Sequence, residues 1–163
     1  MQMPFLSNAL EITDLYSVFM MTLVEKFIPI LPSYVMLPAI GMSATSIYDL
    51  TFRWLLATLG SICGALGWYM LGYIMGPERT RNLVRNYGKW LFLKVELYDK
   101  IALSYQRKSF FITSAGQLLP VVRTYQALPA GVLKLPIFAF LAATAVGAQV
   151  WIIALTSVGY FLN

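Results

Sequence analysis

Histidine is absent from this sequence of 163 residues, and cysteine occurs once, as Cys63. Without histidine, His-based acid–base catalysis, the usual Ser-His triads and most zinc sites are excluded. A single cysteine excludes disulfide frameworks and cysteine-rich metal sites, and Cys63 lies in a glycine-rich stretch that suits close packing. Since no nucleophile, base and orienting group can be assembled, we expect a protein that is not an enzyme and that holds no cofactor or metal.

Charged residues are also scarce, at 12% of the chain, whereas 59% of the residues are hydrophobic. A soluble domain of this length could not bury so much apolar surface. Two uncharged stretches, Trp54 to Pro77 and Leu135 to Leu162, are long enough to cross a bilayer, which takes about 17–25 apolar residues. We predict two transmembrane helices in one membrane domain over residues 1–163. The first residues lack the basic start and cleavage site of a signal peptide, so we expect none to be removed.

The positive charges are concentrated between Pro77 and Lys108, a segment that holds eight of the twelve Lys and Arg residues. By the positive-inside rule this segment faces the cytoplasm. Its basic residues are interleaved with aromatic and aliphatic ones, as expected of a helix lying in the interface beside anionic headgroups. Because the basic residues flank membrane spans, we expect no nucleic-acid partner.

An internal repeat divides the chain into two halves. A proline-rich segment recurs 91 positions later, where Pro29, Tyr34, Leu37, Pro38 and Ala39 correspond to Pro120, Tyr125, Leu128, Pro129 and Ala130. A glycine pattern recurs 87 positions later, where Gly60, Gly72 and Tyr73 correspond to Gly147, Gly159 and Tyr160. We predict repeat 1 over about residues 14–76, a basic linker over 77–108 and repeat 2 over about 109–162. Repeats of this kind are a common way to build a transporter.

The proline-rich segments predict interrupted helices. Pro29 and Pro32 in the first half, and Pro120 and Pro129 in the second, each remove a backbone donor and obstruct a helical turn. Interrupted backbone at membrane depth must be covered by protein or a wet cavity, which favours a re-entrant hairpin with its tip inside the bundle. The arm over residues 14–28 is about 22 Å long as a helix, short of a bilayer core of about 30 Å. A pair of proline-kinked full spans remains the alternative.

These hairpins also predict the relation between the two halves. A hairpin plus one helix crosses the membrane once, so the second half is inverted if the basic linker stays on the cytoplasmic surface. The two hairpins then approach from opposite faces, and such folds place the substrate near the midplane. Gly60, Gly64 and Gly67 share one helix face, which predicts close packing against a neighbouring helix.

Arg123 is the only charged residue between Lys108 and Lys134, and it lies three positions after Pro120. A charge at membrane depth is costly unless it is paired or solvated, which makes Arg123 a functional candidate. Its guanidinium suits phosphate, because the planar fork matches the oxyanion and stays charged. The alternative is an arginine that reaches out to the interface or closes a structural ion pair.

Glu25 is the counterpart of this arginine in the first half, four residues before Pro29. A buried carboxylate can take up a proton, so Glu25 could carry one during transport. Pairing with the adjacent Lys26 at the interface is the alternative. Tyr34 and Tyr125 occupy equivalent places in the two repeats, where their hydroxyls could bond a headgroup or their rings could simply pack.

Four motifs in this order resemble the DedA family, also called the VTT-domain family. They are the glutamate with spaced prolines at residues 25–33, the glycine-rich span at 60–76, the stretch at 116–131 and the pair Gly159-Tyr160. The resemblance implies two opposed re-entrant hairpins in a multi-pass protein of the bacterial cytoplasmic (inner) membrane. It also implies transport of a polyprenyl phosphate, notably undecaprenyl phosphate, or of a glycerophospholipid, with frequent dependence on the proton-motive force.

Two positions depart from the family pattern. The family usually has an acidic residue where this chain has Tyr34 and an arginine where it has Gln117. We interpret this as the loss of a charge pair, which leaves Glu25 and Arg123 as the core of the site.

The residues and the resemblance together predict an all-α lipid flippase or scramblase. Glu25 is the proton-coupling candidate, and the predicted substrate-binding residues are Arg123, Glu25, Tyr34, Gln117 and Tyr125. A small-ion/proton exchanger and a non-transporting structural membrane protein are the alternatives. The expected partners are membrane lipids and, for coupling, protons, and a homo-oligomer is left open.

Overall fold

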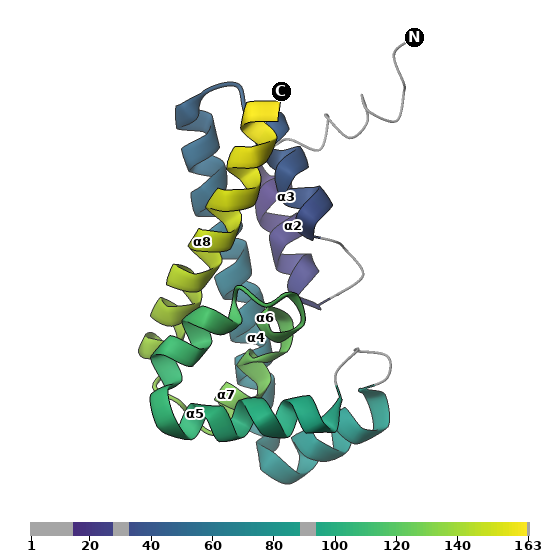
Figure 1. The fold of residues 1–163 in the computed structure, drawn as a ribbon. Helices are drawn as coiled ribbons and strands as arrows, with labels where there is room; N and C mark the ends of the chain where they lie inside the picture. Colours follow the sequence, from purple (N-terminus) through teal and green to yellow (C-terminus); the bar gives the residue numbers. More distant parts are fainter. Residues whose placement is uncertain (1–14, 28–32, 89–93, 163) are drawn as a thin grey trace.

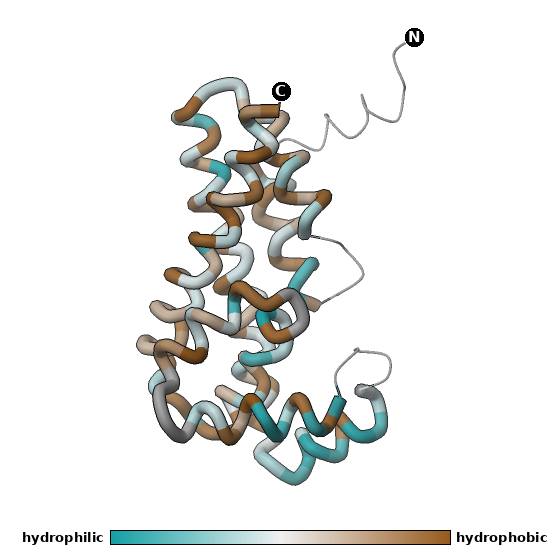
Figure 2. Tube along the Cα trace, in the orientation of Figure 1, coloured by the Kyte–Doolittle hydropathy of each residue, from teal (hydrophilic) through white to brown (hydrophobic). Residues whose placement is uncertain are grey.

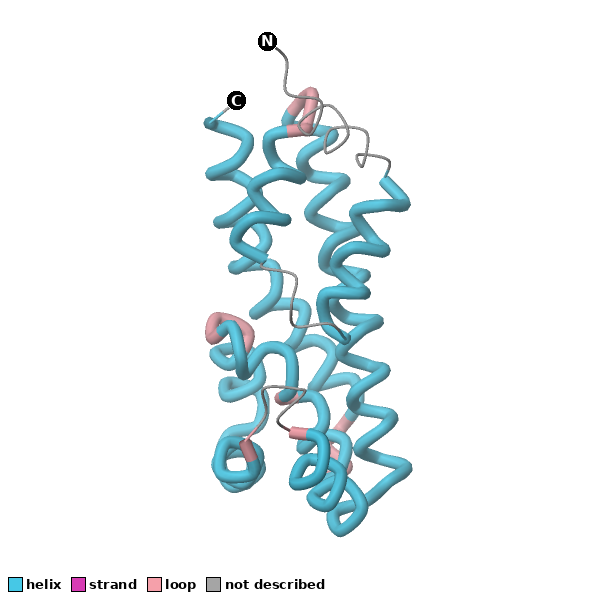
Figure 3. Tube along the Cα trace, turned by 90° about the vertical axis from the view of Figure 1, so that its right-hand side faces the viewer, coloured by secondary structure: helices cyan, strands magenta, loops and turns pink. Residues whose placement is uncertain are grey.

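The computed structural model describes residues 15–27, 33–88 and 94–162, and these residues form helices joined by short turns (Figure 1, Figure 3). The described part of the chain contains no β-strand, which confirms the all-α prediction. The helices are α2 (Leu15–Phe27), α3 (Ser33–Met42), α4 (Ile47–Tyr87), α5 (Val95–Gly116), α6 (Pro120–Tyr125), α7 (Ala127–Val132) and α8 (Ile137–Leu162).

Two helices, α4 and α8, are long and apolar enough to cross a membrane. They correspond to the two uncharged stretches from which the spans were predicted, although α4 begins earlier and continues beyond Pro77, and α8 begins two residues later, at Ile137. In Figure 1 they run along the length of the molecule, α4 downward and α8 upward, and they pack against each other. Their outward faces carry exposed apolar side chains such as Ile74, Phe138 and Phe161, which suits a helix surrounded by lipid.

The long helix α4 changes direction at Gly76. Gly76 has φ 70° and ψ −179°, a left-handed conformation that favours glycine, and Pro77 follows it with a φ already suited to starting a helix. Beyond this kink, the last turns of α4 run across the lower end of the molecule beside α5 (Figure 1). Hydrophilic residues gather at this lower end, as Figure 2 shows.

The shorter helices enter the molecule from its two ends. In Figure 1, α2 descends from the upper end to about mid-height, and α3 returns to the upper end, where it joins α4. From the lower end, the last turns of α5 rise to α6 near mid-height, and α7 returns to the lower end, where it joins α8. Pro29 and Pro32 lie outside the described residues, so the predicted interruption at these two prolines is not described.

The prolines of the second half mark the starts of helices. Helix α5 ends at Gly116, and α6 begins at Pro120 after a short turn. Pro129 lies in the first turn of α7, where its missing N–H is not needed, so it does not break a helix at that point. Pro38 likewise lies within α3, which continues through it.

Helices α2 and α4 pack closely through the predicted glycine face. A Cβ atom on Gly60 would fall on the backbone carbonyl of Phe19, and one on Gly64 would meet the side chain of Lys26. At Gly67 a Cβ atom would meet only the end of the Phe27 ring. The first two glycines are therefore required for the approach of α2, which confirms the packing prediction.

A second set of glycines joins each long helix to a short helix of the other half. Between α4 and α7, Gly72 of α4 lies against the backbone carbonyl of Leu128, and Gly131 of α7 lies against the backbone carbonyl of Tyr69. Contacts of the same kind occur between α3 and α8. Gly159 lies against the backbone carbonyl of Pro38, and Gly41 lies against the backbone carbonyl of Thr156. Gly72 and Gly159 are partners in the sequence repeat, and the residues that they contact, Leu128 and Pro38, are one position apart in that repeat, so the two halves make similar contacts.

Candidate functional site

The Arg123 guanidinium forms a buried ion pair with the Glu25 carboxylate. Arg123 Nη2 lies 2.9 Å from Glu25 Oε1, and the two side chains are 5% and 6% exposed. The Ser33 hydroxyl donates a hydrogen bond to the same Glu25 oxygen. Glu25 comes from the end of α2 and Arg123 from α6, so the pair joins the two halves of the chain near mid-height (Figure 1).

The position of Arg123 follows from the turn before α6. Leu119 is extended, with φ −100° and ψ 117°, and its carbonyl accepts the first bond of α6 from the Arg123 amide at 2.8 Å. Because Pro120 lacks an N–H and has a fixed φ, it suits the first turn of this helix. The turn therefore directs Arg123 into the protein.

Lys26, next to Glu25, is also buried, at 1% exposure. Its Nζ donates to Gln117 Oε1 at 3.1 Å and to the backbone carbonyl of Arg123 at 3.1 Å. The alternative in which Glu25 pairs with Lys26 is not observed, because Glu25 pairs with Arg123. Sequence reasoning missed this role of Lys26. The repeat could have suggested it, because Lys26 and Gln117 are 91 positions apart, the same offset that relates the prolines.

An aromatic residue of α8 completes the group. The Arg123 Cζ atom lies 5.7 Å from the centroid of the Trp151 ring, a cation–π contact, and Tyr34 meets Trp151 edge-on at 5.8 Å between ring centroids. Trp151 was not a sequence candidate, because one tryptophan in an apolar helix gives no functional signal. We call Glu25, Lys26, Gln117, Arg123 and Trp151 the polar cluster.

The structure brings four of the five predicted binding residues to this region. Glu25, Gln117 and Arg123 belong to the polar cluster, and Tyr34, which is 51% exposed, lies at its edge on Trp151. Tyr125 instead packs edge-on against Trp68, with 6.0 Å between ring centroids. Trp68 in turn donates a 2.7 Å hydrogen bond to the Lys26 carbonyl, so Tyr125 contacts a residue that holds the backbone of the cluster in place.

Several buried polar atoms of the cluster have no hydrogen-bond partner among the described residues. They include one acceptor and four donors, namely Glu25 Oε2, Arg123 Nε and Nη1, Gln117 Nε2 and Trp151 Nε1. Buried polar groups are usually satisfied, so such a concentration calls for an explanation. An oxyanion with several acceptor oxygens would satisfy these donors, and a proton on Glu25 would give its free oxygen a donor role.

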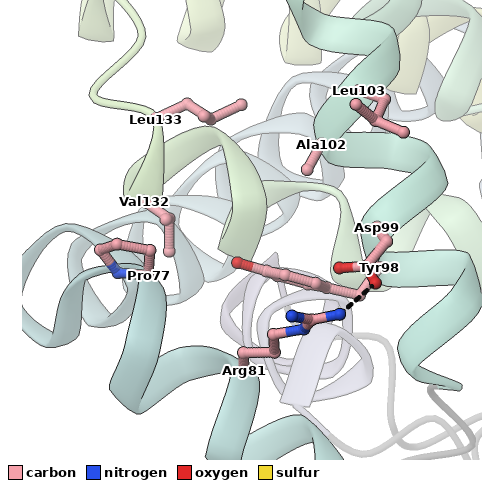
Figure 4. Close-up of a pocket in the computed structure, with 8 residues that line it drawn as sticks. All are labelled: Pro77, Arg81, Tyr98, Asp99, Ala102, Leu103, Val132 and Leu133. Carbon is pink, nitrogen blue, oxygen red and sulfur yellow. Dashed lines mark hydrogen bonds and ion pairs between the residues drawn. The ribbon is translucent and has the colours of Figure 1, made fainter.

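A separate pocket of about 370 Å³ opens at the lower end, between α4, α5 and α7 (Figure 4). Arg81 and Asp99 form a salt bridge of 3.0 Å there, which balances their charges. Burial raises the pKa of the Tyr98 phenol, so this side chain stays neutral. The pocket shares no residue with the polar cluster, and it is lined by Pro77, Arg81, Tyr98, Asp99, Ala102, Leu103, Val132 and Leu133.

Comparison with known proteins gives a family match and several relatives. The sequence pattern of the VTT domain matches residues 31–161. Undecaprenyl phosphate transporter A of Staphylococcus aureus (strain NCTC 8325 / PS 47) is 26% identical over 148 residues, which cover 90% of this chain and 73% of that protein. The Alkaline phosphatase-like protein of Lactococcus lactis subsp. cremoris (strain MG1363) is 31% identical over 150 residues, covering 91% of this chain and 70% of that protein. No solved structure matches.

Proposed function

Because this chain belongs to the VTT domain (DedA) family, we propose that it is a transporter that moves a phosphate-bearing lipid across a bacterial membrane. The candidates are undecaprenyl phosphate and glycerophospholipids. The observation that carries the proposal is the buried Arg123 guanidinium: among the described residues, two of its nitrogen atoms have no hydrogen-bond partner and one carboxylate balances its charge. The name of the Staphylococcus aureus relative supports a polyprenyl phosphate as the cargo.

We propose the inverted-repeat architecture for this transporter. In it, α2 and α3 form one re-entrant hairpin, the end of α5 with α6 and α7 forms the other, and α4 and α8 cross the membrane. The similar glycine contacts, Gly72 on Leu128 and Gly159 on Pro38, support this arrangement because a two-fold relation between the repeats requires such pairs. All residues then form one VTT-like domain in the cytoplasmic membrane, with the basic lower end in the cytoplasm.

In the proposed mechanism, Arg123 exchanges one anion for another. When Glu25 is ionised, its carboxylate holds the guanidinium at 2.9 Å and closes the cluster. A proton taken up at Glu25 Oε2, which has no partner among the described residues, neutralises the carboxylate and weakens the ion pair. The phosphate of the lipid then binds the released guanidinium through two parallel hydrogen bonds. The lipid tail stays in the bilayer throughout.

The closed cluster implies a conformational change during transport. Arg123, Lys26 and Gln117 are all nearly inaccessible, so no phosphate can reach them unless the hairpins separate. The interface between α2 and α6 is held by the ion pair and by the Lys26 bonds to Gln117 and the Arg123 carbonyl. Protonation of Glu25 removes the strongest of these links, and so couples proton uptake to opening.

Transport is favoured over hydrolysis, although one relative has a phosphatase-like name. The sequence has no histidine to act as a base, and the Ser33 hydroxyl is bonded to a carboxylate that is already paired with Arg123. An ion/proton exchanger would use the same carboxylate, but it would not need the four donors of the cluster that have no partner among the described residues. The polar cluster therefore fits an anionic headgroup better than a small cation.

The test is headgroup-resolved transport by the purified protein in liposomes. Undecaprenyl phosphate, phosphatidylglycerol and phosphatidylethanolamine are each supplied in one leaflet, and their arrival in the other is followed in the presence and absence of a pH gradient. We expect protein-dependent translocation of at least one of the phosphate lipids. Proton-driven ion flux without lipid movement, or release of inorganic phosphate, would contradict the proposal.

A further inference from the structure

Lys26 is buried, and no carboxylate of the described residues forms an ion pair with its ammonium. Its two described partners are neutral oxygens, Gln117 Oε1 and the Arg123 carbonyl. Glu25, the adjacent carboxylate, is bound by Arg123. The other described carboxylates lie towards the ends of the molecule and are Asp49 in the first turn of α4, Glu78 beyond the kink at Gly76, and Glu96 and Asp99 in α5.

The cluster contains more cationic side chains than carboxylates among the described residues. Lys26 and Arg123 contribute two positive charges and Glu25 one negative charge, which leaves +1 when all three are ionised. A buried, uncompensated charge is costly, so such a group either loses its charge or acquires a counter-ion. We propose that Lys26 is a second substrate-binding cation, which binds the lipid phosphate together with Arg123 and gives the site a preference for phosphomonoesters. This inference rests on the proposed transport function.

The position of Lys26 fits a shared site. Lys26 and Gln117 are equivalent in the 91-residue repeat, and they touch each other across the two halves. Residues that lie on a two-fold axis meet their own equivalents, so this contact marks the centre of the cluster. A phosphate bound between Arg123 and Gln117 therefore lies within reach of the Lys26 ammonium.

The surrounding helices hold Lys26 in place. Gly64 of α4 leaves room for the aliphatic part of the lysine, since a Cβ atom there would meet Lys26 Cβ and Cγ at 2.6 and 2.7 Å. The Trp68 indole fixes the Lys26 carbonyl with a 2.7 Å bond. An ammonium has three N–H donors and two of them are used by described partners, which leaves one for a ligand.

The charge count also predicts a preference among lipids. A phosphomonoester such as a prenyl phosphate carries up to two negative charges, whereas the phosphodiester of phosphatidylglycerol carries one. When Glu25 is protonated, the two positive charges of Lys26 and Arg123 match the two negative charges of the monoester. Each charge-assisted hydrogen bond contributes about 1.5–3 kcal/mol, or about tenfold or more in affinity. Loss of Lys26 should therefore weaken monoester binding more than diester binding.

The test measures binding of farnesyl phosphate and dihexanoyl phosphatidylglycerol to the purified protein in detergent. Lys26→Met should weaken farnesyl phosphate binding about tenfold and reduce the preference over the diester. Lys26→Met combined with Gln117→Arg should restore most of the affinity, because position 117 lies 3.1 Å from the Lys26 ammonium. Arg81→Met, which removes an exposed cation of the lower end, is the matched control and should bind like the wild type.

Gln117→Glu provides a second test that does not depend on the folding of Lys26→Met. The new carboxylate gives Lys26 a counter-ion, so this variant should melt at a higher temperature and yet bind farnesyl phosphate about tenfold more weakly. A lysine with a structural role alone would give higher stability with unchanged affinity. Wild-type affinity in either folded variant would overturn the role of Lys26. Failure of the wild type to bind either lipid would instead overturn the proposed function.

Discussion

Arg123 and Glu25 come from opposite halves of the chain, and their side chains meet at 2.9 Å inside the protein. The same guanidinium leaves Nε and Nη1 without a described partner. The ion pair therefore links the two halves of the chain, while two nitrogen atoms of the guanidinium can still donate hydrogen bonds to an oxyanion. In the proposed mechanism, the Arg123 guanidinium must be released from Glu25 before it can bind the ligand. Opening of the protein is therefore linked to protonation of Glu25.

The first prediction concerns the stability of this pair. Glu25→Gln and Arg123→Gln should each destabilise the protein, by as much as about 3–5 kcal/mol for removal of one partner of a buried pair, because the other charge is left uncompensated. The double variant should be less destabilised than the sum of the two single variants. Thermal unfolding in detergent would measure this, and strictly additive effects would show that the two charges are not coupled.

The second prediction concerns pH. Glu25→Gln keeps the shape of the side chain but cannot gain or lose a proton, so lipid binding should persist while the pH dependence of transport flattens. Transport at a fixed lipid gradient, measured across a pH series for wild type and variant, would test this. A variant with the full wild-type pH profile would remove Glu25 from the coupling step.

The third prediction concerns the glycines between the halves. Gly72→Ala and Gly131→Ala should each cost about 1–3 kcal/mol, because the added methyl group falls on backbone that cannot move aside. Gly67→Ala is the matched control, since its methyl group meets only the end of the Phe27 ring. Equal melting temperatures for all three variants would contradict the close approach of α4 and α7.

The fourth prediction concerns orientation. In a Cys63→Ser background, which removes the one exposed native thiol, Asn86→Cys should resist an impermeant maleimide in intact cells. Tyr48→Cys, at the other end of α4, should react under the same conditions because this position is exposed on the opposite side. Labelling of Asn86→Cys from outside would reverse the proposed topology.

The sequence predicted those parts of the fold that depend on local pattern. Uncharged length located α4 and α8, and the short arm before the first prolines corresponds to α2. The interruption near Pro120 was predictable because a missing N–H and a fixed φ act on the chain directly. Pro129 gave a weaker signal, because a proline in the first turn of a helix does not interrupt it.

The site was only partly predictable, because its partners are set by tertiary packing. Arg123 and Glu25 stood out as charges in apolar segments, but the partner of Lys26 could not be read from neighbouring residues. Its contact with Gln117 depends on the two halves meeting at equivalent positions. Trp151 gave no signal in the sequence, because nothing there distinguishes it from the other aromatic residues. Its contact with Arg123 is visible only in the folded structure.

The central claim is that the Arg123 fork binds the lipid phosphate, and Arg123→Lys tests it most directly. Lysine keeps the positive charge but cannot form two parallel hydrogen bonds to an oxyanion. Transport of undecaprenyl phosphate in liposomes should fall about tenfold or more for Arg123→Lys, with Arg81→Lys at the lower end unchanged as the matched control. Wild-type transport by a folded Arg123→Lys protein would contradict the account.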